Sequence, residues 1–168
     1  MSDIRCIARV RGMLELLTSA EMSDADRRTI TGGTPGVALM EAAGRVVADA
    51  VSRLRRGRPV TVVCGPGNNG GDGFVLARML AERNTPVRMM LVGERAKLKG
   101  DAAMAAARWA GAVEAATPDA VDPDHVVVDA LFGAGLDREV TGLPRMMIEA
   151  MNRVHAPVVA VDLPSGIN

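Results

Sequence analysis

Four short apolar segments alternate with stretches of helical periodicity, and this alternation is the feature that most constrains the fold. The apolar segments are Val60–Cys64, Pro86–Val92, Val126–Leu131 and Pro157–Val161. Strands that alternate with helices of about 10–15 residues are typical of βαβ units, which build a parallel sheet with helices on both faces. Runs such as the three valines at 126–128 suit strands that are covered on both sides. The sequence therefore predicts the α/β class with a mainly parallel sheet.

Helices are expected before and between these strands. Thr18 and Glu21 form a capping-box pattern, which predicts a helix that runs to about Ile30. Thr34 is expected to be the N-cap of a second helix, with Pro35 at its first position, where the missing N–H costs nothing. The remaining expected helices follow the glycine cluster up to about Arg83, span about Lys99–Ala110 with Met104 and Trp109 among the buried positions, and span Pro144–Val154.

Composition narrows the class of protein. The 168 residues suit one domain, and 20 Lys and Arg balance 20 Asp and Glu. Because the chain is neutral and holds only three aromatic residues, it lacks the basic surface and stacking platforms of a nucleic-acid binder. No apolar run reaches the roughly 18 residues of a membrane span, and the opening MSDIRCIARVRG has no apolar signal-peptide core. These features predict a cytoplasmic location.

The loop after the first strand contains five glycines between Gly65 and Gly73. Glycines there would permit positive φ angles and a close approach of backbone to a ligand at a helix N-terminus. Gly65-x-Gly67-x-x-Gly70 matches the dinucleotide-binding fingerprint, but the Asp72 carboxylate would compete with a pyrophosphate for the same amides. A nicotinamide-dependent oxidoreductase is therefore an alternative, although the chain has no tyrosine to act as a proton donor.

The third strand carries Asp129 among apolar residues, where an unpaired carboxylate would be costly. Capping of a neighbouring loop is one explanation, and contact with a cation or ligand is the favoured one. The loop that follows contains Arg138, which could bind a phosphate or pair with Asp137 or Glu139.

The fourth strand is followed directly by Asp162 and then by Ser165. Because the carboxyl ends of parallel strands lie on one edge of a sheet, these residues should meet Asp129 and the glycine loop there. Ser165 has no histidine close by in the sequence, so a catalytic triad is unsupported. Carboxylate, amide and hydroxyl oxygens together suit a hard cation better than a transition metal.

Three segments then make the chain recognisable: GPGNNGGDGFVLARML, VVDALFGAGLDREV and VAVDLPSGIN, in that order. They closely resemble the NAD(P)H-hydrate epimerases of the YjeF N-terminal domain family, and LLTSAEMSDADRRTI with GVALMEAAG resembles that family's opening helices. The resemblance covers residues 16–168. Residues 1–15 are expected to be a leader outside the fold. The family domain normally continues with further strands, so the resemblance implies that the C-terminal strands are missing.

The resemblance implies a Rossmann-like three-layer α/β/α sandwich, a homodimer and one potassium ion per subunit. It implies epimerisation at C6 of hydrated NADH and NADPH, coupled to a stereospecific dehydratase. The implied potassium ligands are Asn69, Asp129 and Ser165. The implied substrate-binding residues are Asn68, Asn69, Gly70, Gly71, Asp72, Gly133, Ala134, Gly135, Leu136, Asp137, Arg138, Glu139 and Asp162.

Asp162 is the expected catalytic residue. The C6 carbon carries a hydroxyl group and is bonded to the ring nitrogen, so inversion proceeds through an iminium or through ring opening. Either route needs a carboxyl group to move a proton on the oxygen, and a carboxylate stabilises a developing cation. A non-catalytic binding module of the same fold stays an alternative to both enzymes.

Overall fold

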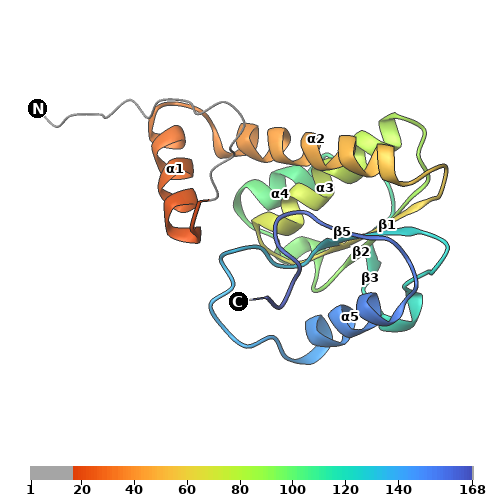
Figure 1. Ribbon diagram of the computed structural model, residues 1–168. Helices are drawn as coiled ribbons and strands as arrows, with labels where there is room; N and C mark the ends of the chain where they lie inside the picture. Colours follow the sequence, from red (N-terminus) through yellow and green to blue (C-terminus); the bar gives the residue numbers. More distant parts are fainter. Residues whose placement is uncertain (1–16, 168) are drawn as a thin grey trace, which may run out of the picture.

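Five parallel strands form one sheet in the order β3–β2–β1–β4–β5 (Figure 1). The computed structural model describes residues 17–167, so the expected leader at residues 1–15 lies outside the described residues. The strands are β1 (Val60–Cys64), β2 (Val87–Leu91), β3 (Glu114–Ala115), β4 (Val126–Ala130) and β5 (Val158–Ala160). The predicted α/β class is confirmed, and every strand pair in this sheet is parallel.

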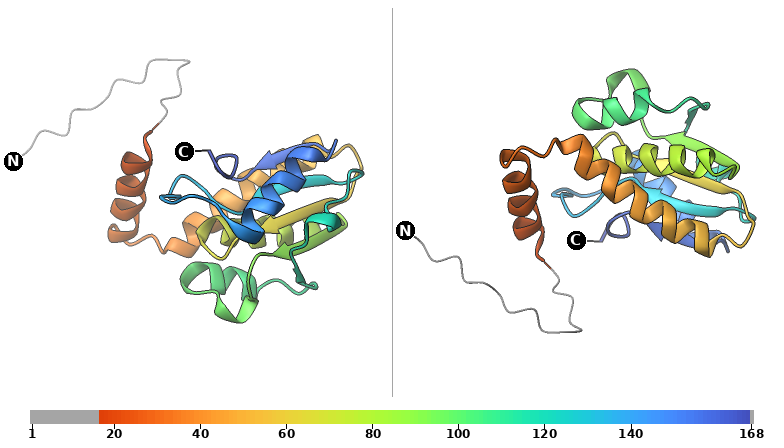
Figure 2. Two further views of the ribbon diagram at one scale, coloured as in Figure 1. Left: turned by 90° about the horizontal axis from the view of Figure 1, so that it is seen from below. Right: turned by 90° about the horizontal axis from the view of Figure 1, so that it is seen from above.

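Helices cover both faces of the sheet, as the alternating pattern predicts. The helices are α1 (Ser19–Thr31), α2 (Gly36–Leu54), α3 (Asn68–Glu82), α4 (Gly100–Ala107) and α5 (Gly142–Arg153), with single 3₁₀ turns η1 (Arg95–Lys97) and η2 (Pro118–Ala120). Helices α2, α3 and α4 pack on one face, and α5 packs on the other (Figures 1 and 2). Within residues 17–167, no helix is both long enough and apolar enough to cross a membrane.

The core consists of two apolar layers separated by the sheet. Because successive side chains of a strand point to opposite faces, Val62 of β1 lies in the layer with α3 while Val63 lies in the layer with α5. The first layer contains Phe74 and Leu80 of α3, and the second contains Met147 of α5. The central strands β1 and β4 are buried throughout, which confirms the expectation from their valine runs.

Several local predictions differ from the structure. The capping box of α1 is present, but α2 begins one residue later than expected, because Pro35 is extended (ψ 141°) and is itself the N-cap. Helix α4 ends at Ala107, where the side chain of Arg95 donates to the carbonyl of Trp109 at 3.0 Å just beyond the helix. Trp109 is buried as expected, whereas Met104 is 48% exposed and its predicted burial is wrong.

The two-residue strand β3 is an addition to the expected sheet. Glu114 accepts hydrogen bonds from Arg88 of β2, the shortest at 2.5 Å, while Arg88 also donates to the carbonyl of Ala120 at 2.9 Å. Two residues are too short to produce an alternating apolar pattern, so periodicity could not reveal this strand.

The glycine cluster forms both a turn and the start of α3, which begins at Asn68 rather than after Gly73. None of its glycines adopts a positive φ, so that expectation is wrong. A Cβ atom on Gly70 would lie 1.9 Å from the carbonyl oxygen of Gly65, and one on Gly65 would lie 2.1 Å from the carbonyl oxygen of Leu131. These glycines are therefore required because backbone packs directly on backbone where β1, α3 and the end of β4 meet.

A matched pair of substitutions tests this packing. Gly70→Ala should destabilise the fold by about 1–3 kcal/mol or more, because backbone atoms cannot move aside as a side chain would. Gly67→Ser is the control: no atom lies within 4 Å of a Cβ there, and serine is favoured at the N-cap position that Gly67 occupies. Urea unfolding measures both, and equal stability of the two variants would contradict the packing argument.

Candidate functional site

Asp129, near the end of β4, joins the loops that follow β4 and β5. Its side chain is only 4% exposed. The Oδ1 atom accepts from the Leu131 amide at 3.2 Å and from the Ser165 hydroxyl at 2.6 Å, and Oδ2 accepts from the Ser165 amide at 2.7 Å. Of the two explanations offered for this buried carboxylate, loop capping is the one these contacts describe.

The backbone of Phe132 lies at the centre of a second set of contacts. Its amide donates to the Ser165 hydroxyl at 3.0 Å, and its carbonyl accepts from the Asn69 side-chain amide at 2.9 Å. The structure therefore brings Asn69, Asp129 and Ser165 together from three different segments. Their role as cation ligands stays a prediction.

The donor set in this place is compatible with a hard cation. Asn69 uses its Nδ2 group for the Phe132 carbonyl, which leaves its Oδ1 atom available. Asp129 accepts three hydrogen bonds, and no ion pair to it forms within the described chain. A buried carboxylate without a positive side chain, surrounded by amide, hydroxyl and carbonyl oxygens, is the environment that oxygen-binding cations prefer.

Asp162 lies at the same edge of the sheet and is exposed. Its Oδ2 atom accepts from the Ala134 amide at 2.8 Å, which ties it to the loop after β4. A Cβ atom on Gly133 would lie 2.5 Å from the same oxygen, so a larger residue there would displace this carboxylate. The expectation that Asp162 stands at the strand edge beside the Gly133–Glu139 loop agrees with this geometry.

Asp72 is half-buried in α3, one helical turn beyond Asn69. Burial, the negative charge of Asp162 and the negative charge of Asp26, in that order, raise the pKa of Asp72 to about 7. The side chain is therefore a carboxylic acid for part of the time near neutral pH. Two carboxyl groups in different surroundings, the half-buried Asp72 and the exposed Asp162, consequently stand at one edge of the sheet.

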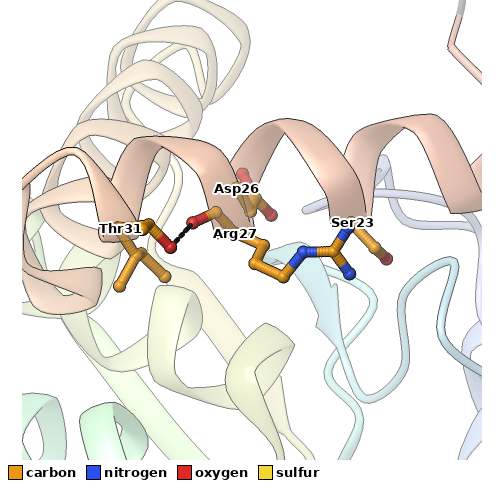
Figure 3. A pocket seen from close by; sticks show the side chains of 5 residues that line it. Ser23, Asp26, Arg27 and Thr31 are labelled. Carbon is orange, nitrogen blue, oxygen red and sulfur yellow. Dashed lines mark hydrogen bonds between the residues drawn. The ribbon is translucent and has the colours of Figure 1, made fainter.

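Asp26 is a residue that sequence reasoning missed. It belongs to α1, which stands apart from the helices on the sheet but on the same side of the molecule as the loop after β4 (Figures 1 and 2). Asp26 and four other residues of α1 line a hollow of about 350 Å³ (Figure 3): Ser23, Arg27, Ile30 and Thr31. The helical spacing of these five residues is visible in the sequence, but nothing there places α1 beside the site.

The other expected substrate-binding residues are of two kinds, glycines packed against the protein interior and residues exposed at the surface. The α-carbons of Gly70 and Gly71 face into the protein, and a Cβ on Gly71 would meet Met40 of α2 at 2.6 Å. Exposed residues are Asn68, Gly135, Asp137, Arg138 and Glu139, with Leu136 partly exposed. Arg138 forms no ion pair with either neighbouring acid in the described chain. With Glu139 it lines a hollow of about 300 Å³ that reaches Arg145 and Glu149.

Comparison with known proteins gives consistent matches. Residues 36–168 match the family model described as YjeF-related protein N-terminus. The NAD(P)H-hydrate epimerase of Rhodobacter capsulatus is 41% identical over 167 residues, covering 92% of this chain and 78% of that protein. The bifunctional NAD(P)H-hydrate repair enzyme Nnr of Coxiella burnetii is 38% identical over 164 residues, covering 93% of this chain and 33% of that protein.

A solved structure extends the likeness to the backbone. The crystal structure of the yeast protein ynu0 (YNL200c) has a TM-score of 0.77 and is 28% identical, covering 91% of this chain and 72% of the yeast chain. The family match includes the glycine turn, strand β4 and the loop after β5, which together form the candidate site. This chain belongs to the family of YjeF-related protein N-terminal domains.

Proposed function

We propose that this chain is an isomerase that epimerises C6 of hydrated NADH and NADPH, converting the R form to the S form for repair of the cofactor. Family membership and relatives named NAD(P)H-hydrate epimerase support the reaction class. The observation that carries the proposal is the exposed Asp162 carboxylate, which the Ala134 amide fixes at the carboxyl edge of the sheet beside the half-buried Asp72. Two neighbouring carboxyl groups, one of them held in place, can transfer a proton to and from the hydroxyl group of the substrate ring.

The chemistry follows from the substrate. The C6 hydroxyl group leaves as water when it gains a proton and the ring nitrogen shares its lone pair, which produces an iminium. On the alternative route, the bond between C6 and the nitrogen breaks and the ring opens. In both cases a carboxyl group moves a proton at the C6 oxygen, and a carboxylate in a partly desolvated place stabilises the positive charge.

Potassium is part of the proposal. Asn69, Asp129 and Ser165 would hold the ion together with backbone carbonyls, and the Phe132 carbonyl lies among their contacts. When bound, the ion supplies a positive charge that balances the buried Asp129 carboxylate. The side chains themselves fix the two loops that carry Asp162 and Ala134.

The proposal extends to a partner reaction. The bifunctional Nnr relatives are about three times as long as the segment they share with this chain, since the shared segment covers 33% and 32% of their lengths. We propose that the S form passes to an NAD(P)H-hydrate dehydratase. The homodimer and the cytoplasmic location stay predictions, and sedimentation of the purified chain tests the dimer.

A coupled assay tests the function. The protein is mixed with R- and S-NADHX and a dehydratase that accepts only the S form. An epimerase accelerates consumption of the R form, and a binding module or an oxidoreductase leaves that rate unchanged.

Asp162→Asn should slow epimerisation by about 10²–10⁴-fold, the usual contribution of general acid–base assistance. Asparagine keeps the size of the side chain and can still accept from the Ala134 amide, so substrate affinity should fall much less. Asp124→Asn is the control, because Asp124 is exposed and precedes β4 at the opposite end of the sheet. Near-normal turnover in folded Asp162→Asn would reject this residue as catalytic.

Potassium should raise the melting temperature relative to a bulky organic cation at equal ionic strength. An ion that binds only the native state contributes about 2.7 kcal/mol at a hundredfold excess over its Kd. Ser165→Ala should reduce this potassium dependence before it affects turnover, and it should also lower the basal stability because the Asp129 carboxylate and the Phe132 amide each lose a partner. Identical melting curves in potassium and in the organic cation would contradict the proposed potassium site.

A further inference from the structure

At residues 70–73, near the start of α3, the packing leaves room for one side chain only. A Cβ atom on Gly71 would lie 2.6 Å from the Met40 side chain of α2, and one on Gly73 would lie 2.6 Å from the sulfur of Cys64. With Gly70 already against the backbone of Gly65, Asp72 is the single residue of this stretch that carries a side chain. The tight packing on both sides of Asp72 therefore fixes the backbone that carries this one carboxyl group.

Helix α2 adds to this rigidity. Gly44 of α2 lies against the same turn, and a Cβ atom there would be 3.1 Å from the carbonyl oxygen of Asp72. The backbone of Asp72 is thus held by a close helix–helix contact on one side, and its carboxyl group lies within electrostatic range of Asp162.

The carboxyl group of Asp72 has no partner that would stabilise its charge. Only burial and neighbouring negative charges act on it among the described residues, without a hydrogen-bond donor or a basic side chain. Asp162 after β5 and Asp26 of α1 lie within electrostatic range of it, as does the buried thiol of Cys64 at the end of β1. Asp72 lies beyond the first turn of α3, where the helix dipole has little effect.

We propose, on the basis of the epimerase function, that Asp72 is a second catalytic residue, the acid that protonates the departing C6 hydroxyl group, while Asp162 is the base for the water that returns. The proton of Asp72 moves to the C6 oxygen, the C6–O bond breaks, and the lone pair of the ring nitrogen forms the C6=N bond. Water then adds to the opposite face of C6 and loses a proton to Asp162, and the electrons return to nitrogen. Solvent carries the proton from Asp162 back to Asp72, so no atom or charge is gained.

This division of roles uses the difference between the two carboxyl groups. Two titratable groups whose surroundings separate their proton affinities form an acid and a base at one pH. Asp162 is exposed and accepts a hydrogen bond from the Ala134 amide, whereas Asp72 is half-buried and has no hydrogen-bond partner among the described residues. Burial and the neighbouring negative charges raise the pKa of Asp72. The acid form of Asp72 is present below its pKa of about 7 and is lost as the pH rises through that value.

The pH dependence of kcat for R-NADHX tests the inference. In the unmodified chain, kcat should fall about tenfold per pH unit above neutrality. Asp72→Asn should lower kcat by about 10²–10⁴-fold and abolish this alkaline limb. Asp26→Asn should move the limb to lower pH, because loss of a negative charge lowers the pKa of Asp72, while Asp124→Asn should leave it in place.

The outcomes separate this inference from the proposed function. If the unmodified chain epimerises R-NADHX and folded Asp72→Asn keeps both the rate and the alkaline limb, Asp72 is not the acid although the enzyme assignment stands. If Asp26→Asn does not shift the fall of kcat at alkaline pH, Asp72 is not the group that causes this fall, and the inference is likewise overturned. Carboxyl ¹³C NMR tests the inference without an activity assay. The signal of the Asp72 carboxyl carbon should titrate with a midpoint near pH 7 in the unmodified chain and at lower pH in Asp26→Asn. A midpoint at the usual value for aspartate in the unmodified chain would contradict the inference.

Discussion

The hydrogen bonds of the buried Asp129 carboxylate are the constraint on which the site depends. Strands β4 and β5 are parallel neighbours, so the loops after them leave the same edge without a tight turn to join them. Asp129 connects the two loops by accepting hydrogen bonds from Leu131 and Ser165, and the Ser165 hydroxyl in turn accepts a hydrogen bond from the Phe132 amide. Each donor that Asp129 lost would leave a buried carboxylate oxygen less well satisfied, so the network favours a single arrangement of the loops.

The same edge shows how far the sequence alone determines the fold. The valine-rich runs of β1 and β4 located the central strands to within a residue, because a strand buried on both faces must be apolar throughout. The convergence of Asn69, Asp129 and Ser165 also follows from parallel topology. Strand β3 and the exposure of Met104 did not follow, since a short edge strand and a short helix depend on contacts that periodicity does not record.

The glycine cluster illustrates a second limit. Its glycines suggested positive φ angles and a close approach of the backbone to a ligand, but none of them has a positive φ, and they pack closely against Leu131, Met40 and Cys64. A fingerprint can therefore match while its glycines serve a different purpose. Likewise, the capping box predicted α1, yet only the three-dimensional arrangement brings Asp26 into electrostatic range of Asp72.

Three carboxyl groups at one edge would repel one another if their surroundings were alike. Asp129 is stabilised by three hydrogen bonds, Asp162 by solvent and the Ala134 amide, and Asp72 by keeping its proton. Each environment suits a different role, since a buried charge can organise loops or attract a cation, an exposed charge can accept a proton, and a desolvated acid can donate one. Because an iminium on a bound nicotinamide ring is itself positive, its formation would relieve the repulsion between Asp72 and Asp162 once the proton has moved, so the charge arrangement favours the intermediate more than the neutral substrate.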